Sequence, residues 1–349
     1  MSYPGLLSWY DQHKRALPFR GVRDPYAVWV SEIMLQQTRT ETVAGYYMRF
    51  LSLFPTVNAL AAAPEEAVLK AWEGLGYYSR ARNLHRAAQT VAAAYDGVFP
   101  GSYEAIRALP GVGDYTAAAV ASIAFGLPYP AIDGNLTRVI SRVHGIREDV
   151  GIPSVRRRIE ALAREHIDPE RPGDWNQALM DIGATICVPG TPECAACPLA
   201  DICDARAEDD AELLPVRAAA KPPVPVAVGV GLVTCGDRIL MQRRDAALLR
   251  GLWVFFLTEG DSSREAMRKK LRSLGLDAVF KRDLGEARHV FTHRIWNMKL
   301  YHFEVAQLSS VRGFAWTDAE ALRTLPLPTA MKAAKNAAEA ILNAAACIE

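Results

Sequence analysis

The chain has 349 residues, half of them hydrophobic, and its formal net charge at pH 7 is +1. That length is enough for two domains with separate cores, and the near-zero charge gives no global electrostatic indication of a nucleic-acid partner. The apolar runs stay below the ~18 residues that a membrane-spanning helix needs. Residues 1–15 predict an ordinary amphipathic helix without a secretory signal, so we expect a prokaryotic cytoplasmic protein with reduced cysteines.

The first part of the chain, up to about residue 205, has the pattern of helices. Apolar residues recur at the spacing of one helical face in the stretches 64–75, 81–95 and 116–127. Proline and glycine at 99–101 and 126–128 separate these stretches. We therefore predict a mostly α-helical N-terminal domain.

A glycine-rich turn lies between two helical stretches, in the sequence Leu109-Pro-Gly-Val-Gly-Asp-Tyr-Thr-Ala117. Gly111 and Gly113 permit the positive φ and close backbone approach that a tight hairpin requires. The free amides at the start of the following helix then suit a phosphate oxygen. We interpret the segment as a helix–hairpin–helix phosphate-binding element, and a plain turn between helices is the alternative.

Four cysteines with short, uneven spacing follow the helical stretches. Cys187, Cys194, Cys197 and Cys203 form the pattern C-x6-C-x2-C-x5-C. Four thiolates at such separations can close around one iron–sulfur cube. Zinc is the alternative, although four-cysteine zinc sites favour two C-x2-C pairs set well apart, and only one such pair is present here. Six cysteines in the whole chain do not indicate a disulfide framework.

The composition changes after the cysteines. An acidic patch at 208–210 and the stretch Lys221-Pro-Pro-Val-Pro indicate a linker. Strand-like segments follow at 224–234, 238–244, 253–257 and 297–305, and helical segments lie at 263–275 and 321–344. The second part of the chain is therefore predicted to be a smaller α+β domain.

The order of these motifs resembles that of the DNA glycosylase superfamily that includes endonuclease III and the MutY-type adenine glycosylases. The helix–hairpin–helix element is followed by Asp133, 20 residues after Gly113, and then by the four cysteines. The resemblance implies a helix-hairpin-helix glycosylase domain over 1–206, with a 4Fe-4S cluster loop at 187–203, and a linker at 207–224. Residues 225–349 would form a Nudix-like 8-oxoguanine recognition domain. One 4Fe-4S cluster is the implied cofactor.

Two positions distinguish members of this superfamily. Tyr115 stands where the endonuclease III type has a lysine that forms a Schiff base with the sugar, and without an amine imine chemistry and strand cleavage are not available. The segment Val30-Ser-Glu-Ile-Met-Leu-Gln-Gln-Thr38 resembles a signature of adenine glycosylases, in which the glutamate, here Glu32, is the general acid. A solvent-facing helix carboxylate is the alternative for Glu32 taken alone.

The chemistry of the reaction explains why two carboxylates are needed. Protonation of N7 makes adenine a neutral leaving group, so a carboxylic acid with a raised pKa is wanted, and Glu32 on an apolar helix suits that role. A second, ionised carboxylate stabilises or captures the oxocarbenium-like sugar, and the resemblance implies Asp133 for this role. Tyr115 and Asn135 would position Asp133 or the catalytic water.

An enzyme that acts on a base must also take it out of the stack. The segment Gly74-Leu-Gly-Tyr-Tyr-Ser-Arg80 resembles a family motif in which a tyrosine, here Tyr77, enters the duplex. Gln37 would contact the opposite bases, and Arg23 would line the adenine pocket. The usual L-P-W-R sequence upstream is Leu17-Pro-Phe-Arg20 here. A buried tyrosine pair is the alternative reading of the Tyr77 motif.

The C-terminal domain resembles the Nudix fold but lacks its magnesium-binding glutamates. The segment that aligns with the Nudix box is 268–276, which contains no glutamate, so nucleotide hydrolysis is not expected. In adenine glycosylases an F-S-H loop of this domain senses 8-oxoguanine, and Phe291, Thr292 and His293 occupy the matching place here. Thr292 retains the hydroxyl group of the usual serine. For His293, the alternative interpretation is a purely structural role.

The resemblance implies a monofunctional adenine glycosylase of base excision repair. Its partner would be double-stranded DNA with 8-oxoguanine·adenine or guanine·adenine mispairs, and we expect a monomer that associates with the nucleoid through DNA and not with membranes. The loop 188–193 contains no lysine or arginine, so Arg206 or backbone amides would contact DNA near the cluster. An endonuclease III-like lyase is one alternative, and a non-catalytic DNA-binding or redox module is another.

Overall fold

The computed structural model describes residues 3–219 and 221–346 of the chain. The chain divides into two compact units. The helical unit contains the residues up to Ala63 together with Arg82–Ala219, and the mixed unit contains Pro64–Ala81 together with the residues after 220. Within the described ranges, no helix is both long enough and apolar enough to cross a membrane.

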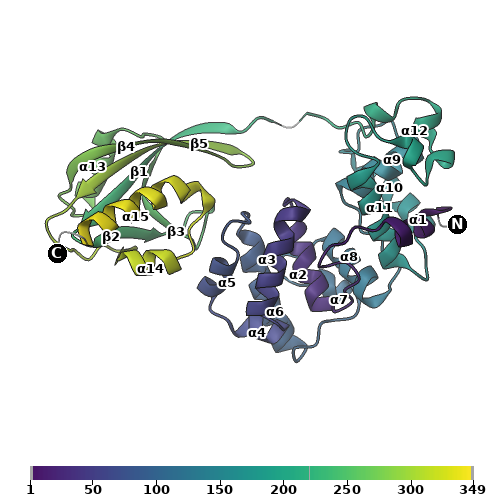
Figure 1. Cartoon of the computed structure of the whole chain (residues 1–349), viewed down its shortest axis with the longest axis horizontal. Helices are drawn as coiled ribbons and strands as arrows, with labels where there is room; N and C mark the ends of the chain where they lie inside the picture. Colours follow the sequence, from purple (N-terminus) through teal and green to yellow (C-terminus); the bar gives the residue numbers. More distant parts are fainter. Residues whose placement is uncertain (1–2, 220, 347–349) are drawn as a thin grey trace. The chain divides into compact units, whose positions relative to one another are not determined.

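The helical unit consists of short and medium-length helices, as the sequence pattern predicted (Figure 1). They are α1 (Leu6–His13), α2 (Pro25–Leu35), α3 (Thr40–Leu53), α4 (Val57–Ala62), α6 (Ser79–Ala94, which begins in the mixed unit), α7 (Tyr103–Arg107), α8 (Asp114–Phe125), α9 (Gly134–Val143), α10 (Pro153–His166), α11 (Pro172–Thr185) and α12 (Asp204–Ala207).

Helices α2 and α8 pack against each other in the interior of the helical unit. Helix α2 begins cleanly because Pro25 occupies its first turn and the Asp24 side chain accepts a hydrogen bond from the Ala27 amide at 3.1 Å. Its residues 26–34 are all buried, as expected for a helix that is apolar on nearly every side. The alanine-rich α8 allows close approach, so polar groups on these two helices face each other away from water.

Helices α9 and α11 form a second packed pair in the helical unit. Asp133 caps α9, and a Cβ on Gly183 of α11 would come within 2.6 Å of the Asn135 Cβ, so only glycine permits this approach. The chain after α12 stays packed on this pair: Leu214 is buried and its carbonyl accepts a hydrogen bond from Arg142. The first half of the stretch expected as a linker is therefore ordered against the helical unit.

The mixed unit is built on one six-stranded sheet with the strand order β4-β5-β1-β3-β2-β6. Strands β1 and β5 are parallel, and the other neighbouring pairs are antiparallel. The strands are β1 (Val224–Cys235), β2 (Arg238–Arg243), β3 (Trp253–Glu259), β4 (Val279–Val290), β5 (Arg294–Glu304) and β6 (Phe314–Thr317). The helices are α5 (Glu65–Ala71), α13 (Arg264–Ser273), α14 (Ala319–Thr324) and α15 (Lys332–Ala346).

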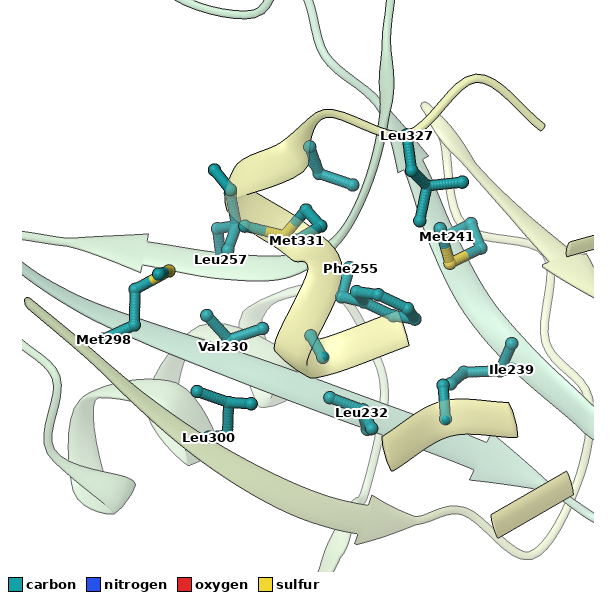
Figure 2. Close-up of a cluster of buried hydrophobic side chains, with 14 of the residues drawn as sticks. Val230, Leu232, Ile239, Met241, Phe255, Leu257, Met298, Leu300, Leu327 and Met331 are labelled. Carbon is teal, nitrogen blue, oxygen red and sulfur yellow. The ribbon is translucent and has the colours of Figure 1, made fainter. Parts of the chain in front are cut away.

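Alternating side chains divide the core of the mixed unit between the two faces of the sheet. Val230 and Leu232 of β1 join the cluster that α15 covers, whereas Val233 joins the cluster that α13 covers. Figure 2 shows the first cluster, with Met331 beside the strand residues Val230 and Phe255. The sheet therefore has helices on both faces, which confirms the predicted α+β class.

Sequence reasoning missed two strands and one helix boundary in this unit. Strand β4 is largely exposed and polar, and β6 has four residues, so neither carries a strong alternating pattern. The predicted continuous helix 321–344 is interrupted at Pro326 and Pro328 and becomes α14 and α15. Proline has no backbone N–H to donate to a helical hydrogen bond, and it disfavours the helical conformation of the residue before it.

The segment Pro64–Ala81 packs with the C-terminal residues of the mixed unit, although the sequence places it among the N-terminal helices. Lys70 Nζ donates to the Leu325 carbonyl at 3.0 Å, and the Tyr78 hydroxyl donates to the Leu327 carbonyl at 3.3 Å. The Trp253 indole donates to Glu66 Oε1 at 2.5 Å. Helix α5 and the loop after it are thus attached to the stretch around α14.

Candidate active site and cysteine loop

A buried carboxyl and a phenol hydroxyl meet where α2 packs on α8. Glu32 is 4% exposed, and the Tyr115 hydroxyl donates a hydrogen bond to its Oε2 at 2.7 Å. Burial raises the pKa of Glu32, the Tyr115 hydrogen bond and the Arg20 charge oppose this rise, and the charge of Asp133 adds to it. Glu32 is therefore biased toward its protonated form, as a general acid requires.

Asp133 lies at the N-terminus of α9, where its carboxylate accepts hydrogen bonds from several donors. It accepts from the Leu136 amide at 2.7 Å and from Asn135 Nδ2 at 2.9 Å. Burial raises the pKa of Asp133, while these donors and the charge of Arg138 oppose the rise. Burial thus raises the pKa of both carboxyls, but more groups stabilise the ionised form of Asp133 than that of Glu32.

Tyr115 and Asp133 line one cleft, with an empty volume of about 1590 Å³, which is ample for a nucleoside. Glu32 does not line this cleft and is reached through the Tyr115 hydroxyl. Farther along the cleft, Tyr103 and Tyr129 stack with ring centroids 4.3 Å apart. The sequence-predicted residues Glu32, Tyr115, Asp133 and Asn135 are thus brought together at one place.

A chain of hydrogen bonds connects Asp133 to the first cysteine of the cluster motif. Asn135 donates to Asp133 and accepts from Arg138 Nη2 at 2.9 Å. Arg138 is 9% exposed, and it also donates to the carbonyls of Gly183 and Cys187, both at 2.6 Å. The orientation of Asp133 therefore depends on the backbone at the start of the cysteine loop.

The four cysteine side chains Cys187, Cys194, Cys197 and Cys203 line one cavity with an empty volume of about 380 Å³. Arg142 is 2% exposed and holds the loop together, donating to Cys187 Sγ at 3.3 Å, to the Val188 carbonyl at 2.9 Å and to the Gly190 carbonyl at 3.2 Å. Burial raises the pKa of the Cys197 thiol to about 11.

The residues around this cavity fit a thiolate-bound metal group. Four cysteines, the ligand type that iron–sulfur clusters and structural zinc sites both use, line the same cavity.

The predicted hairpin is formed by the turn between α7 and α8. Gly111 has φ +76°, and a Cβ at this position would come within 2.4 Å of the Asn83 Cβ. Arg107 braces the hairpin by donating to the Val112 carbonyl at 2.9 Å and to Asp114 at 2.5 Å. Gly113 caps α8 without a side chain, so the first amides of this helix remain open to a ligand.

Gln37 and Tyr77 are exposed residues with left-handed backbone conformations, φ 58° and 46° respectively. Such conformations are uncommon outside glycine and recur at functional sites. Tyr77 is 46% exposed, Arg80 lies over its ring at 5.5 Å, and its hydroxyl is 3.1 Å from Thr292 Oγ1 within the mixed unit. The two segments expected to read DNA, around Tyr77 and around Thr292, are therefore in contact.

The remaining predicted residues lie in different surroundings. Arg23 is exposed and lines a separate cavity with Tyr10 and Gln177, away from the cleft of Asp133. Phe291 is partly buried and packs edge-on against Trp296 at 5.1 Å, whereas Thr292 and His293 are exposed. The ring of Phe291 thus anchors the loop to Trp296, whereas the side chains of Thr292 and His293 are exposed.

Sequence reasoning missed the buried charged residues around the site. Arg138 and Arg142 follow Asp133 at helical spacing, and two arginines one turn apart on an otherwise apolar helix face could have indicated buried partners. Asp181 and Arg20, which bond to each other at 2.6 Å, are 161 residues apart and carry no local signal.

The fold and this site define the class of protein. Residues 30–169 match the HhH-GPD superfamily of base excision DNA repair proteins, and residues 229–337 match the NUDIX domain. The structure of a thermostable thymine-DNA glycosylase is similar, with 30% sequence identity and a TM-score of 0.53 over 58% of this chain and 94% of that chain. A non-covalent endonuclease III–DNA complex is 25% identical with a TM-score of 0.50 over the same shares.

Curated relatives narrow this class to one family. Human adenine DNA glycosylase is 36% identical over an alignment that covers 94% of this chain and 72% of the human protein. The mouse protein is 36% identical over 94% of this chain and 76% of its own length, and the Schizosaccharomyces pombe protein is 41% identical over 59% and 49%. The chain belongs to the adenine DNA glycosylase family, which confirms the resemblance seen in the sequence and makes the protein an enzyme that acts on DNA.

The raised pKa of Glu32 predicts that this residue lowers the stability of the folded protein at neutral and alkaline pH. The folded state binds the Glu32 proton more tightly than the unfolded chain does, so stability falls as pH rises from the unfolded pKa through the folded one. Glu32→Gln should therefore be more stable than wild type at alkaline pH, by about 0.5–2 kcal/mol, and this difference should vanish at pH values below the pKa of glutamate in the unfolded chain. Urea denaturation at several pH values measures it, and equal stability throughout would contradict the expectation.

Proposed function

We propose that this protein excises adenine mispaired with 8-oxoguanine or guanine in double-stranded DNA and leaves the DNA strand intact. The observation that carries the proposal is the buried Glu32–Tyr115 hydrogen bond, with Asp133 beside the same phenol. The Tyr115 hydroxyl, which donates a hydrogen bond to Glu32, occupies the position where a lyase would need a nucleophilic amine. Hydrolysis of the glycosidic bond is then the available chemistry.

In this mechanism the two carboxyls act in turn on a flipped adenosine. Glu32 donates its proton to N7 of adenine, so that the base leaves neutral. Asp133 remains ionised and stabilises or captures the oxocarbenium-like sugar, and Asn135 fixes its orientation through the 2.9 Å hydrogen bond. Tyr115 orients Glu32 and keeps water from its carboxyl until the base enters.

Binding of DNA would use the exposed features of both units. The open amides after Gly113, at the start of α8, suit a backbone phosphate. Tyr77 and Gln37, held in left-handed conformations, would fill the space that the flipped nucleotide leaves and contact the opposite base. Arg23, which lines a cavity separate from that of Asp133, would contact the adenine only if this cavity opens to the base.

We predict that Glu32→Gln and Asp133→Asn each lower the single-turnover rate of adenine release from an 8-oxoguanine·adenine duplex by about 10²–10⁴-fold, because each removes a charge or proton that the transition state needs. Glu148→Gln, which removes an exposed carboxylate that pairs with Arg158, is the matched control and should act like wild type.

Full activity in both variants would contradict the mechanism and would favour a non-catalytic DNA-binding or redox module. A nicked strand without alkali treatment would favour the lyase alternative, since only an imine intermediate leads to strand cleavage.

The four cysteines Cys187, Cys194, Cys197 and Cys203 would hold one 4Fe-4S cluster. Such a cluster can carry an electron, but base excision requires none, so we assign it a structural role. It would fix the loop whose Cys187 carbonyl accepts from Arg138, and through Arg138 and Asn135 the position of Asp133. Arg206, the cation nearest to the loop in sequence, pairs with Asp201 at 3.3 Å, so backbone amides are the better candidates for a DNA contact here.

Replacing one cluster cysteine should remove the cofactor and loosen the loop. Cys197→Ser is expected to lose the broad visible absorbance of the purified protein and most of its iron, about four atoms per chain in wild type. Cys235→Ser, in strand β1 of the mixed unit, is the control and should retain both. Zinc without iron in the wild-type protein would overturn the assignment.

The exposed Thr292 and His293 would read 8-oxoguanine opposite the adenine. Because Phe291 packs against Trp296, its replacement would disturb the core, so the exposed pair gives the cleaner test. The double variant Thr292→Ala, His293→Ala should lose about tenfold of its preference for 8-oxoguanine·adenine over guanine·adenine, as expected for one lost hydrogen bond.

Competition between the two duplexes measures this preference, with Thr329→Ala, an exposed threonine outside the loop, as the control. An unchanged preference in the double variant would remove the sensing role from this loop.

A further inference from the structure

The cleft that Tyr115 and Asp133 line also carries three arginines, which are Arg156, Arg164 and Arg217. Its empty volume of about 1590 Å³ is more than one flipped nucleoside requires, so part of the cleft is left for the strand around that nucleoside. An arginine that lacks an acidic partner in the protein is available to an anionic ligand, whereas a paired arginine is less so. The existing partners of the three arginines therefore indicate what this part of the cleft can bind.

The three carboxyls that line the cleft already have donors of their own. Glu160 accepts from Arg164 Nη2 at 2.8 Å, and Asp114 accepts from Arg107 Nε at 2.5 Å. Asp133 accepts from the backbone and side-chain amides at the start of its own helix. Of the three arginines, Arg164 is thus paired within the cleft, and Arg156 and Arg217 have no acidic partner in the part of the chain that the structure describes.

A single buried residue, Val150, anchors both of these arginines at the cleft. Its carbonyl accepts from Arg156 Nε at 3.2 Å, and its amide donates to the carbonyl of Val216, the residue before Arg217, at 3.0 Å. Val150 is 3% exposed and lines the same cleft. The contact through Nε leaves both Nη groups of Arg156 for a ligand, so two guanidinium groups flank one fixed point of the cleft wall.

A DNA phosphate is the anion that suits two arginines in the cleft of Asp133. Guanidinium groups bind phosphate oxygens in bidentate geometry, and such contacts position DNA without reading its sequence. A strand that brings its sugar to Asp133 also brings the phosphates beside that sugar, and the ionised Asp133 repels them. The open amides at the start of α8, where Tyr115 lines the cleft, suit one of these phosphates, and the arginine pair suits another.

We propose that Arg156 and Arg217 clamp a backbone phosphate of the DNA strand that carries the flipped adenosine, close to that adenosine. The inference rests on the proposed function, in which the sugar of the adenosine reaches Asp133. It gives the two arginines a place in DNA binding and no part in the chemical step. If they are instead ordinary solvated charges, their removal acts through net charge alone, and any exposed arginine of α10 would have the same effect.

The salt dependence of DNA binding separates these two possibilities. Arg156→Gln and Arg217→Gln in the full chain should each weaken binding to an 8-oxoguanine·adenine duplex by about tenfold at low salt, as expected for one lost charged hydrogen bond. The double variant should lower the slope of log Kd against log salt by about 0.9, the value for one lost phosphate contact. A 2′-fluorine on the adenosine disfavours the oxocarbenium-like sugar and keeps the duplex uncleaved during the measurement. Arg157→Gln is the matched control, because Arg157 is the next residue of α10, is exposed and does not line the cleft, so its slope should match that of wild type.

Removal of charge from the DNA instead of the protein locates the contact. An uncharged methylphosphonate replaces, one at a time, the phosphates on either side of the adenosine. At one of these positions it should weaken binding of the wild-type protein by about tenfold and leave binding of the double variant unchanged, because the contact is already lost there. The same scan on the opposite strand should weaken both proteins alike.

An unchanged slope in the double variant, or an equal loss in Arg157→Gln, would overturn the clamp, and so would methylphosphonate effects that are the same in both proteins at every position. If Arg156→Gln does not fold, as judged by circular dichroism, Arg217→Gln decides alone, since its side chain forms no hydrogen bond within the described residues. Asp133→Asn tells this failure apart from failure of the proposed function. Full activity in Asp133→Asn removes the sugar site on which the clamp rests, whereas an inactive Asp133→Asn beside wild-type binding in Arg156→Gln and Arg217→Gln removes only the clamp.

Discussion

The rest of the site depends on the removal of the Glu32 carboxyl from water between α2 and α8. Desolvation disfavours the ionised carboxylate, and the single hydrogen bond from Tyr115 satisfies the group without compensating a full charge. The apolar sequence of α2 and the alanines of α8 therefore set the pKa of Glu32 as well as the packing of the two helices. Each neighbouring charge matters because the interior screens it weakly.

The second carboxyl, Asp133, has more groups that favour its ionised form, because it caps the N-terminus of α9. Asp133 accepts hydrogen bonds from the Leu136 backbone amide and the Asn135 side chain, and it lies near the positive charge of Arg138. Each of these three groups favours its ionised form. The same helix carries Arg138 and Arg142 toward the cysteine loop, so its N-terminus holds Asp133 while its body holds the loop. The cysteine loop, although far from Asp133 in sequence, is thereby connected to it through Arg138 and Asn135.

The mixed unit keeps a sheet with helices on both faces, but the segment aligned with the Nudix box carries no metal-binding glutamate. What it holds instead is a solvent-facing loop in contact with Tyr77, through the hydroxyls of Tyr77 and Thr292 at 3.1 Å. Because α5 and its following loop pack with this unit, the tyrosine expected to enter DNA and the loop expected to sense the lesion belong to one compact body.

Local sequence alone determined the helices, most of the strands and the hairpin glycines, because spacing and short motifs encode features that form within a few residues. The resemblance of its motifs to a known family pointed to Glu32, Tyr115 and Asp133. The polar edge strand β4 and the proline break before α15 were missed, since pattern is weak at exposed edges and a helical composition hides a break. Only the tertiary structure decided that Asp181 faces Arg20, that Arg138 links Asn135 to Cys187, and that residues 64–81 pack with the C-terminal unit. These contacts join residues far apart in the chain, and the direction of each carboxyl pKa depends on burial and on such partners, which no local pattern specifies.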